Sequence, residues 1–163
     1  MTLTELRNSR GLLVDTNLLV LLVVGQLGLD QINSYKRTSL YSAEDYKLLY
    51  SFVERFRRVV TTPNILTETS NLLEGYTCKE QKALALLESI AEAMDEIFYD
   101  SMPTMRAYPK SYLKFGLSDA VIHRVAEENY LVLTDDLNFC AYLQGKGLLA
   151  INFNNLRTDA FLH

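Results

Sequence analysis

Short aliphatic runs alternate with segments of helical character along this chain of 163 residues. An aliphatic run bounded by glycine or polar residues is typical of a buried parallel strand, whereas apolar positions three and four residues apart are typical of a helix that packs on one face. On this basis we expect strands at residues 11–15, 59–62, 97–99, 130–134 and 148–153. We expect helices at residues 16–25, 43–58, 63–75, 78–97, 119–129 and 135–147.

This alternation predicts an α/β fold. Parallel strands are joined by right-handed crossover helices, which cover both faces of the sheet. We therefore expect a three-layer α/β/α arrangement with a central, mostly parallel sheet. The length fits one domain that spans residues 1–163.

Several polar residues mark the expected helix boundaries. Side-chain oxygens of Ser and Thr accept the unpaired amide hydrogens of a first helical turn, so we expect caps at Ser42, at Thr62 before Pro63, and at Ser118. Thr77 and Glu80 have the spacing of a capping box that opens the helix at 78–97. Gly25 and Gly75 are expected helix ends.

The net charge of −4 argues against a broad basic surface that would bind nucleic acid through its phosphates. Local basic clusters remain at 36–37 and 55–58. A third group, whose cations alternate with aromatic residues as on single-strand contact surfaces, gives three possible RNA contacts: Arg106, Lys110 and Lys114. Solvated cations beside core aromatics are the alternative for each cluster.

The chain carries no signal for export or for a membrane. Its two cysteines, Cys78 and Cys140, form neither a disulfide framework nor a zinc-binding spacing. The apolar run at 12–24 is too short to span a bilayer and contains Asp15, and residues 1–10 lack the order of a signal peptide. We expect a cytoplasmic protein that does not bind a membrane.

Acidic residues occur at related places in this pattern. Asp15 ends the first expected strand, Asp119 opens a late helix, and Asp135 and Asp136 follow the strand at 130–134. Glu68 lies in a helix at the spacing of its apolar positions. In a parallel sheet these carboxylates converge at the carboxyl ends of the strands, where ligands gather.

Such a cluster has a chemical interpretation and a local one. Without basic residues in the same motifs, clustered carboxylates either take up protons or bind cations, and oxygen ligands favour Mg²⁺ or Mn²⁺. Metal-dependent phosphodiester hydrolysis is the chemistry that follows. Alternatively, Asp15 caps a helix, Asp119 complements a helix dipole and Asp136 serves a turn.

Four motifs occur in the order and positions found in one family of nucleases: "LLVDTNLL", "TTPNILTETSNLL", "GLSDAVI" and "YLVLTDDLNF". The pattern resembles the PIN-domain nucleases, and among them the ribonuclease toxins of bacterial toxin–antitoxin pairs. The resemblance covers residues 11–153. It implies a PIN-like fold and a metal-dependent endoribonuclease that cuts RNA, is inhibited by an antitoxin-type protein and forms homodimers in some cases.

The resemblance also implies a set of site residues. Four acids match the positions that hold Mg²⁺ or Mn²⁺ and carry catalysis: Asp15, Glu68, Asp119 and Asp136. The motifs leave open whether Asp135 or Asp136 is the fourth acid. Supporting positions are Asn17, Thr134, Asp135 and Ser118. Relative to compact toxins of the family, residues 26–58 are a candidate insertion or elaborated helical region that remodels the groove or contacts a partner.

Other functions fit the chain less well. A catalytically silent PIN-like scaffold that binds RNA or protein is the main alternative. A receiver-type signalling domain needs a lysine just after a late strand, whereas Lys146 precedes the strand at 148–153. A haloacid-dehalogenase-type phosphatase needs an acid where Asn17 stands. His123, one helical turn after Asp119, is interpreted as a packing residue rather than a ligand.

Overall fold

The computed structural model describes residues 3–76 and 79–162. The strands are β1 (Leu12–Val14), β2 (Val59–Thr61), β3 (Asp95–Glu96), β4 (Leu131–Thr134) and β5 (Ala150–Asn152). The longer helices are α2 (Thr16–Leu27), α4 (Ala43–Val53), α5 (Pro63–Leu73), α6 (Glu80–Glu92), α9 (Leu117–Glu127), α10 (Leu137–Gly145) and α11 (Phe153–Leu162). The shorter ones are α1 (Leu3–Asn8), α3 (Gln31–Ser34), α7 (Ser101–Ala107) and α8 (Pro109–Phe115).

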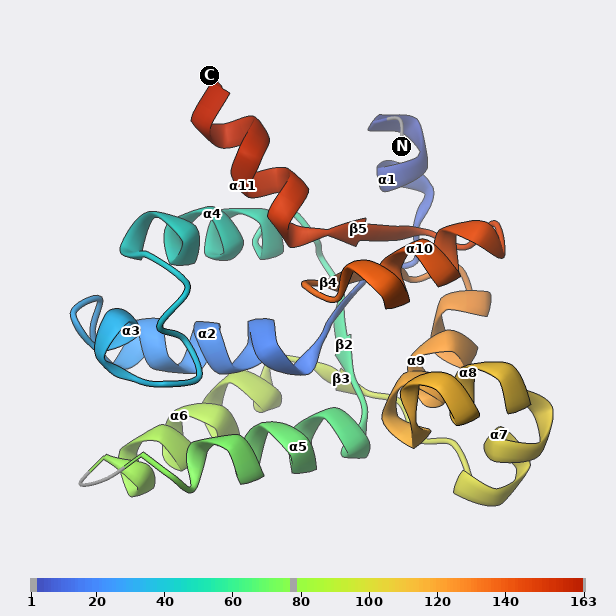
Figure 1. The fold of residues 1–163 in the computed structure, drawn as a ribbon, viewed down its shortest axis with the longest axis horizontal. Coiled ribbons are helices and arrows are strands. Elements are labelled where there is room, and N and C mark those ends of the chain that lie inside the picture. The colour runs from blue at the N-terminus through green and yellow to red at the C-terminus, as the bar shows by residue number, and fades with distance from the viewer. Residues whose placement is uncertain (1–2, 77–78, 163) are drawn as a thin grey trace.

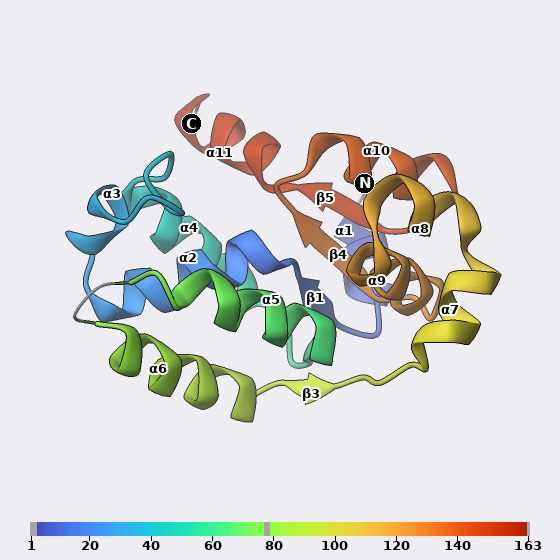
Figure 2. The same cartoon turned by 60° about the horizontal axis from the view of Figure 1, so that its bottom comes forward.

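The five strands form one all-parallel sheet in the order β3-β2-β1-β4-β5 (Figure 1). Helices flank this sheet, in agreement with the expected three-layer α/β/α architecture (Figure 2). β1 lies in the centre between β2 and β4, with Leu13 in register with Val60 on one side and with Val132 on the other. The predicted α/β fold class is confirmed.

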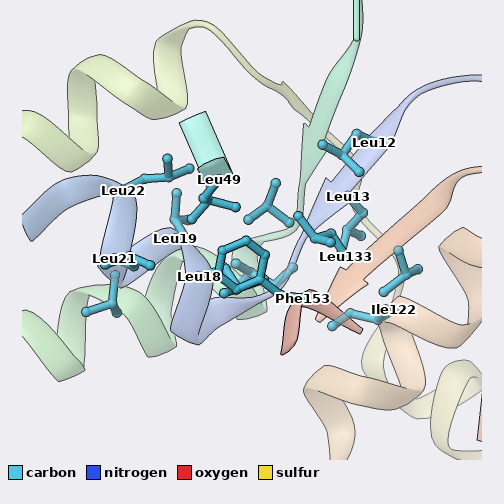
Figure 3. Packing of buried hydrophobic residues seen from close by; sticks show 14 of the residues in the cluster. Leu12, Leu13, Leu18, Leu19, Leu21, Leu22, Leu49, Ile122, Leu133 and Phe153 are labelled. Atoms are coloured by element: carbon cyan, nitrogen blue, oxygen red, sulfur yellow. The ribbon is translucent and has the colours of Figure 1, made fainter. Parts of the chain in front are cut away.

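The core is built around β1 and α2 (Figure 3). Every side chain from Leu18 to Val24 is buried, because α2 packs against α4, α5 and α6. A helix surrounded on all sides has no polar face, which explains why this segment is almost wholly apolar. Leu133 of β4, Ile122 of α9 and Phe153 continue the same cluster.

Two of the predicted caps are present. The Ser42 hydroxyl accepts from the Asp45 amide while the Asp45 carboxylate accepts from the Ser42 amide, which is a complete capping box. Thr62 caps α5 by accepting from the Ile65 amide at 3.2 Å. The third prediction is wrong, because α9 begins at Leu117 after Gly116 and so places Ser118 inside the helix. Gly116 has a φ of 96°, a backbone conformation that glycine adopts readily.

Several boundaries differ from the sequence predictions. β3 lies at Asp95–Glu96 rather than at 97–99, and α4 ends at Val53 rather than at residue 58. α2 continues past Gly25, where a side chain would collide with the ring of Tyr46. That glycine therefore serves close packing between α2 and α4 rather than helix termination. The predicted capping residue Thr77 lies outside the described residues.

Five helices were not predicted: α1, α3, α7, α8 and, after β5, α11. Cys140 is a buried free cysteine. Across residues 3–76 and 79–162, no helix has both the length and the apolar character needed to cross a membrane.

Candidate functional site

A hollow of about 350 Å³ lies at the carboxyl ends of β1 and β4. It contains five carboxylate residues, and none of the described residues that line it is a lysine, arginine or histidine. The lining residues are Asp15, Thr16, Asn17, Glu68, Asn71, Leu72, Asp119, Asp135 and Asp136. The fold thus brings together the acids that the sequence analysis singled out, and we call this surface the acidic hollow.

Asp15 joins β1 to α2 at the base of the acidic hollow. Its carboxylate accepts a hydrogen bond from the Thr134 hydroxyl at 2.6 Å and another from the Thr16 amide at 2.7 Å. Burial raises the pKa of Asp15 to about 6, against the lowering effect of these hydrogen bonds and with a further increase from Asp135 and Glu68. Asp15 therefore caps a helix and faces other carboxylates at the same time, so the local and the chemical interpretations coexist.

Glu68 projects into the acidic hollow from the middle of α5. Its side chain is exposed, and a carboxylate oxygen accepts from the Thr16 hydroxyl at 3.0 Å. Thr16 lies 52 residues away along the chain. No local partner for Glu68 could be predicted, because its partner Thr16 belongs to another helix, α2.

Asp119 lies in the first turn of α9 and is the most strongly perturbed acid of the site. Burial, followed by the negative charges of Asp15, Glu68 and Asp136, raises its pKa to about 8. A carboxyl group with this pKa is mostly protonated at neutral pH as long as no cation is bound beside it. Such a pKa indicates that negative charge is concentrated here without a compensating cation from the described residues.

Asp135 and Asp136 both line the hollow but make different contacts. Asp136 caps α10 by accepting from the Phe139 amide at 2.9 Å, and its charge acts on Asp119. The Asp135 carboxylate accepts a hydrogen bond from the side-chain amide of Asn17 at 3.3 Å and another from the Tyr41 hydroxyl at 2.6 Å. Asp136 therefore faces the other acids from a helix cap, whereas Asp135 is held in place by two side-chain donors.

Tyr41 is a site residue that the sequence analysis missed. It lies in the candidate insertion at 26–58. Its side chain is buried, and its hydroxyl donates a hydrogen bond to Asp135, which lines the hollow. Burial and this hydrogen bond raise the pKa of Tyr41 above its usual value, so the phenol remains a donor. Asn71, one turn after Glu68 on α5, was also missed: it lies within the "TTPNILTETSNLL" motif, of which only the acid Glu68 was singled out.

A second contact ties Tyr41 to the last helix. Arg157 of α11 lies over the Tyr41 ring at 5.1 Å, and its guanidinium donates to Asp45 at 2.8 and 3.0 Å. It also donates to the Leu40 carbonyl at 3.2 Å. The turn that carries Tyr41 is therefore fixed between α4 and α11.

Other predicted residues lie outside the acidic hollow. Ser118 is buried, and its hydroxyl has no hydrogen-bond partner among the described residues. The three possible RNA contacts are exposed on α7 and α8 and do not line the hollow: Arg106, Lys110 and Lys114. The aromatic neighbour Phe115 packs against Phe139 rather than facing solvent.

His123 is a packing residue in this structure. It is buried between the rings of Tyr108 and Tyr142, with Nε2 3.5 Å from a carboxylate oxygen of Glu127. Burial lowers the pKa of His123, which favours the neutral ring. It does not line the acidic hollow.

The chemistry of the donors suits a hard divalent cation. The hollow offers carboxylate, amide and hydroxyl oxygens, which are the ligands that Mg²⁺ and Mn²⁺ prefer. Within the described chain, no three His, Cys, Asp or Glu side chains are grouped closely enough to form a metal site as they stand. A cation would therefore have to draw the carboxylates closer together.

Comparison with protein-family models and with curated proteins finds no match to this chain.

Proposed function

We propose that the chain is a divalent-metal-dependent endoribonuclease of the PIN type, whose active site is the acidic hollow. The observation that carries the proposal is the convergence of five acidic residues in one hollow whose described lining includes no basic residue. The pKa of Asp119, raised to about 8 first by burial and then by three neighbouring acids, supports it, because a cation bound between these groups offsets both costs of ionisation. The four sequence motifs that resemble PIN nucleases supply the reaction class.

Asp15, Glu68, Asp119 and Asp136 are the residues that would hold Mg²⁺ or Mn²⁺, because they act on one another electrostatically across the hollow. A cation bound there supplies two effects: it lowers the pKa of a water molecule and offsets negative charge on a phosphoryl oxygen. The hollow is open to solvent at Glu68, so an RNA phosphate can approach from that side.

The remaining residues position this set. Thr134 and the Thr16 amide orient the Asp15 carboxylate, and the Thr16 hydroxyl orients Glu68. Tyr41 and Asn17 hold Asp135 beside them, where its charge adds to the field on Asp15. Hydrogen bonds of this kind keep ligands in a fixed geometry and are as important as the ligands themselves.

RNA as the substrate, a protein inhibitor of the antitoxin type, a homodimer and a cytoplasmic location belong to the same proposal and follow from the resemblance. A silent scaffold that binds RNA or protein is the second candidate. The observation that favours it is that the described acids are not grouped as a metal site without rearrangement.

The test is cleavage of a mixed cellular RNA pool by purified protein with Mg²⁺, Mn²⁺ or EDTA. Asp119→Asn removes the acid and keeps its shape, and Asp159→Asn is the matched control because Asp159 is exposed on α11 away from the hollow. We expect cleavage that requires metal, is lost in Asp119→Asn and persists in Asp159→Asn.

Calorimetry with Mn²⁺ separates the two candidates. Binding by wild type that is lost in Asp119→Asn, together with cleavage, supports the nuclease. Absence of both Mn²⁺ binding and cleavage in wild type would overturn it in favour of the scaffold.

A further inference from the structure

A second hollow, of about 500 Å³, lies at the opposite edge of the sheet. β1, β2 and β4 all begin here: the Leu12 amide donates to the Arg58 carbonyl, and the Arg10 amide donates to the Asn129 carbonyl. The described lining is Leu6, Arg7, Ser9, Arg10, Gly11, Phe52, Arg55, Phe56, Arg57 and Arg58. We call it the arginine hollow.

The arginine hollow concentrates positive charge in a chain whose net charge is −4. It contains five of the nine arginines of the sequence, and no described residue of its lining is acidic. Like charges gathered around one hollow raise the free energy of the chain where acids of the protein do not offset them, so an anion bound there is stabilised. Arginine binds phosphate through two parallel hydrogen bonds, which gives both geometry and affinity.

Two of these arginines are held in place by the protein itself. Arg10 pairs with Glu128 at 3.4 Å and Arg58 pairs with Asp95 at 2.6 Å. Both guanidinium groups also lie over the ring of Tyr130, at 5.1 and 5.5 Å from its centre. Arg10 and Arg58 therefore have partners within the chain, and part of their charge is offset.

Arg55 and Arg57 are different, because they make no ion pair or side-chain hydrogen bond with the described part of the chain. They lie in the segment between α4 and β2, where the predicted helix through residue 58 ends early. Both are exposed at the rim of the hollow, so their donors are available to a ligand.

The arginine hollow also has apolar lining residues. Phe52 and Phe56 lie with their ring centres 5.4 Å apart, and Leu6 of α1 belongs to the same lining. Aromatic rings bind the flat ring of a nucleobase by stacking. A lining that combines guanidinium donors with aromatic rings suits a small molecule that carries a phosphate group, with or without a nucleobase.

We infer that the arginine hollow is a binding site for the phosphate group of a small molecule, either free phosphate or a mononucleotide. β1 has three residues, and at about 3.3 Å per residue it separates this hollow from the acidic one by about 10 Å. The chain enters β1 from α1 and leaves it toward α2 (Figure 1). The site is thus distinct from the acidic hollow and does not depend on nuclease activity.

The test is calorimetric titration of the full chain at low ionic strength with EDTA present, so that no divalent cation takes part. The probes are inorganic phosphate, AMP and, as an anion without phosphate, citrate. The variant is Arg55→Gln with Arg57→Gln, and the control is Lys82→Gln with Lys146→Gln, which removes the same charge from exposed positions outside the hollow.

We expect wild type to bind phosphate or AMP with a Kd below about 1 mM. The arginine variant should weaken this binding at least about tenfold, since each charged hydrogen bond contributes about that factor, while the lysine control retains it. Tighter binding of AMP than of phosphate would identify a nucleotide as the ligand, and equal binding would identify phosphate.

Three outcomes would overturn the inference: no saturable binding of phosphate or AMP up to about 10 mM, equal loss of affinity in the lysine control, or citrate binding as tight as that of both phosphate probes. Because EDTA is present and no RNA is cut, failure here is distinguishable from failure of the proposed nuclease.

Discussion

The raised pKa of Asp119 makes the stability of the metal-free protein depend on pH. In the folded chain the carboxyl group keeps its proton up to a pKa of about 8, whereas its ordinary value is 3.8. The folded state therefore binds more protons than the unfolded state between these values. Stability is fully present below the ordinary value and is lost as the pH rises toward 8.

The size of this change in the free energy of unfolding depends on the pH range over which it is measured. Between pH 5.5 and about 8 the difference in proton binding extends over about 2.5 pH units, each corresponding to about 1.4 kcal/mol. The upper limit is thus about 3.5 kcal/mol. Solvent still reaches part of Asp119, which is half-buried, so we expect about 1–2 kcal/mol.

Asp119→Asn tests this value, because the amide keeps the shape of the side chain and cannot ionise. The free energy of unfolding is measured by urea denaturation at pH 5.5 and 8.5 with EDTA, for wild type, Asp119→Asn and the exposed control Asp159→Asn. The loss of stability on raising the pH should be about 1–2 kcal/mol smaller in Asp119→Asn than in the other two proteins. At pH 8.5 this variant should also be the most stable of the three.

The reasoning is refuted if Asp119→Asn shows the same pH dependence as wild type, or if it is less stable than wild type at pH 8.5. In that case the neighbouring acids do not oppose ionisation of Asp119, and the electrostatic argument for a cation site fails with it.

Three further outcomes are expected. Mn²⁺ at a hundredfold excess over its Kd should raise the Tm of wild type by the equivalent of about 3 kcal/mol. Asp15→Asn should not show this rise, and a rise in the variant equal to that in wild type would place the cation elsewhere. Tyr41→Phe should lower the free energy of unfolding in urea by about 1 kcal/mol, because Asp135 loses its phenol donor; no change would mean that water replaces it. Thr62→Ala should lower the free energy of unfolding by about 1 kcal/mol because the α5 cap is lost, whereas Thr67→Ala, at an exposed position of the same helix, should lower it by less than about 0.5 kcal/mol. Equal losses in the two variants would contradict the role of Thr62 as a cap.

Most strands could be predicted because their side chains are buried on both faces. β1 and β4 are uninterrupted apolar runs, and every residue of both is buried. β3 is different: its two residues, Asp95 and Glu96, are exposed at the edge of the sheet, so the apolar pattern placed the strand at Ile97 instead. An edge strand of two acidic residues carries no signal of burial.

Four acids of the candidate site were found because each ends or follows a strand or opens a helix, and Glu68 was found because it lies at the spacing of the apolar positions of α5; both are local properties of the sequence. Thr134 and Asn17 were named as supporting residues through the motifs, but the acid that each one contacts, and the contact from Tyr41, were not predicted, because these contacts join distant parts of the chain. Tyr41 and Asp135 are 94 residues apart, and only the folded turn before α4 brings them within 2.6 Å. Ser118 shows the opposite error, since a favourable capping residue lies within α9 when the helix starts earlier.

Arg157 connects the stability of the last helix to the geometry of the acidic hollow. Its guanidinium joins α11 to Asp45 of α4 and lies over the ring of Tyr41, which in turn holds Asp135. These elements consequently form one cooperative opening unit, in which undocking of α11 releases the turn and the carboxylate together. Amide hydrogens of α11 and of the turn before α4 should then exchange with solvent at a common rate. Docking of α11 would in this way control how firmly Asp135 is held, although no residue of α11 lines the acidic hollow.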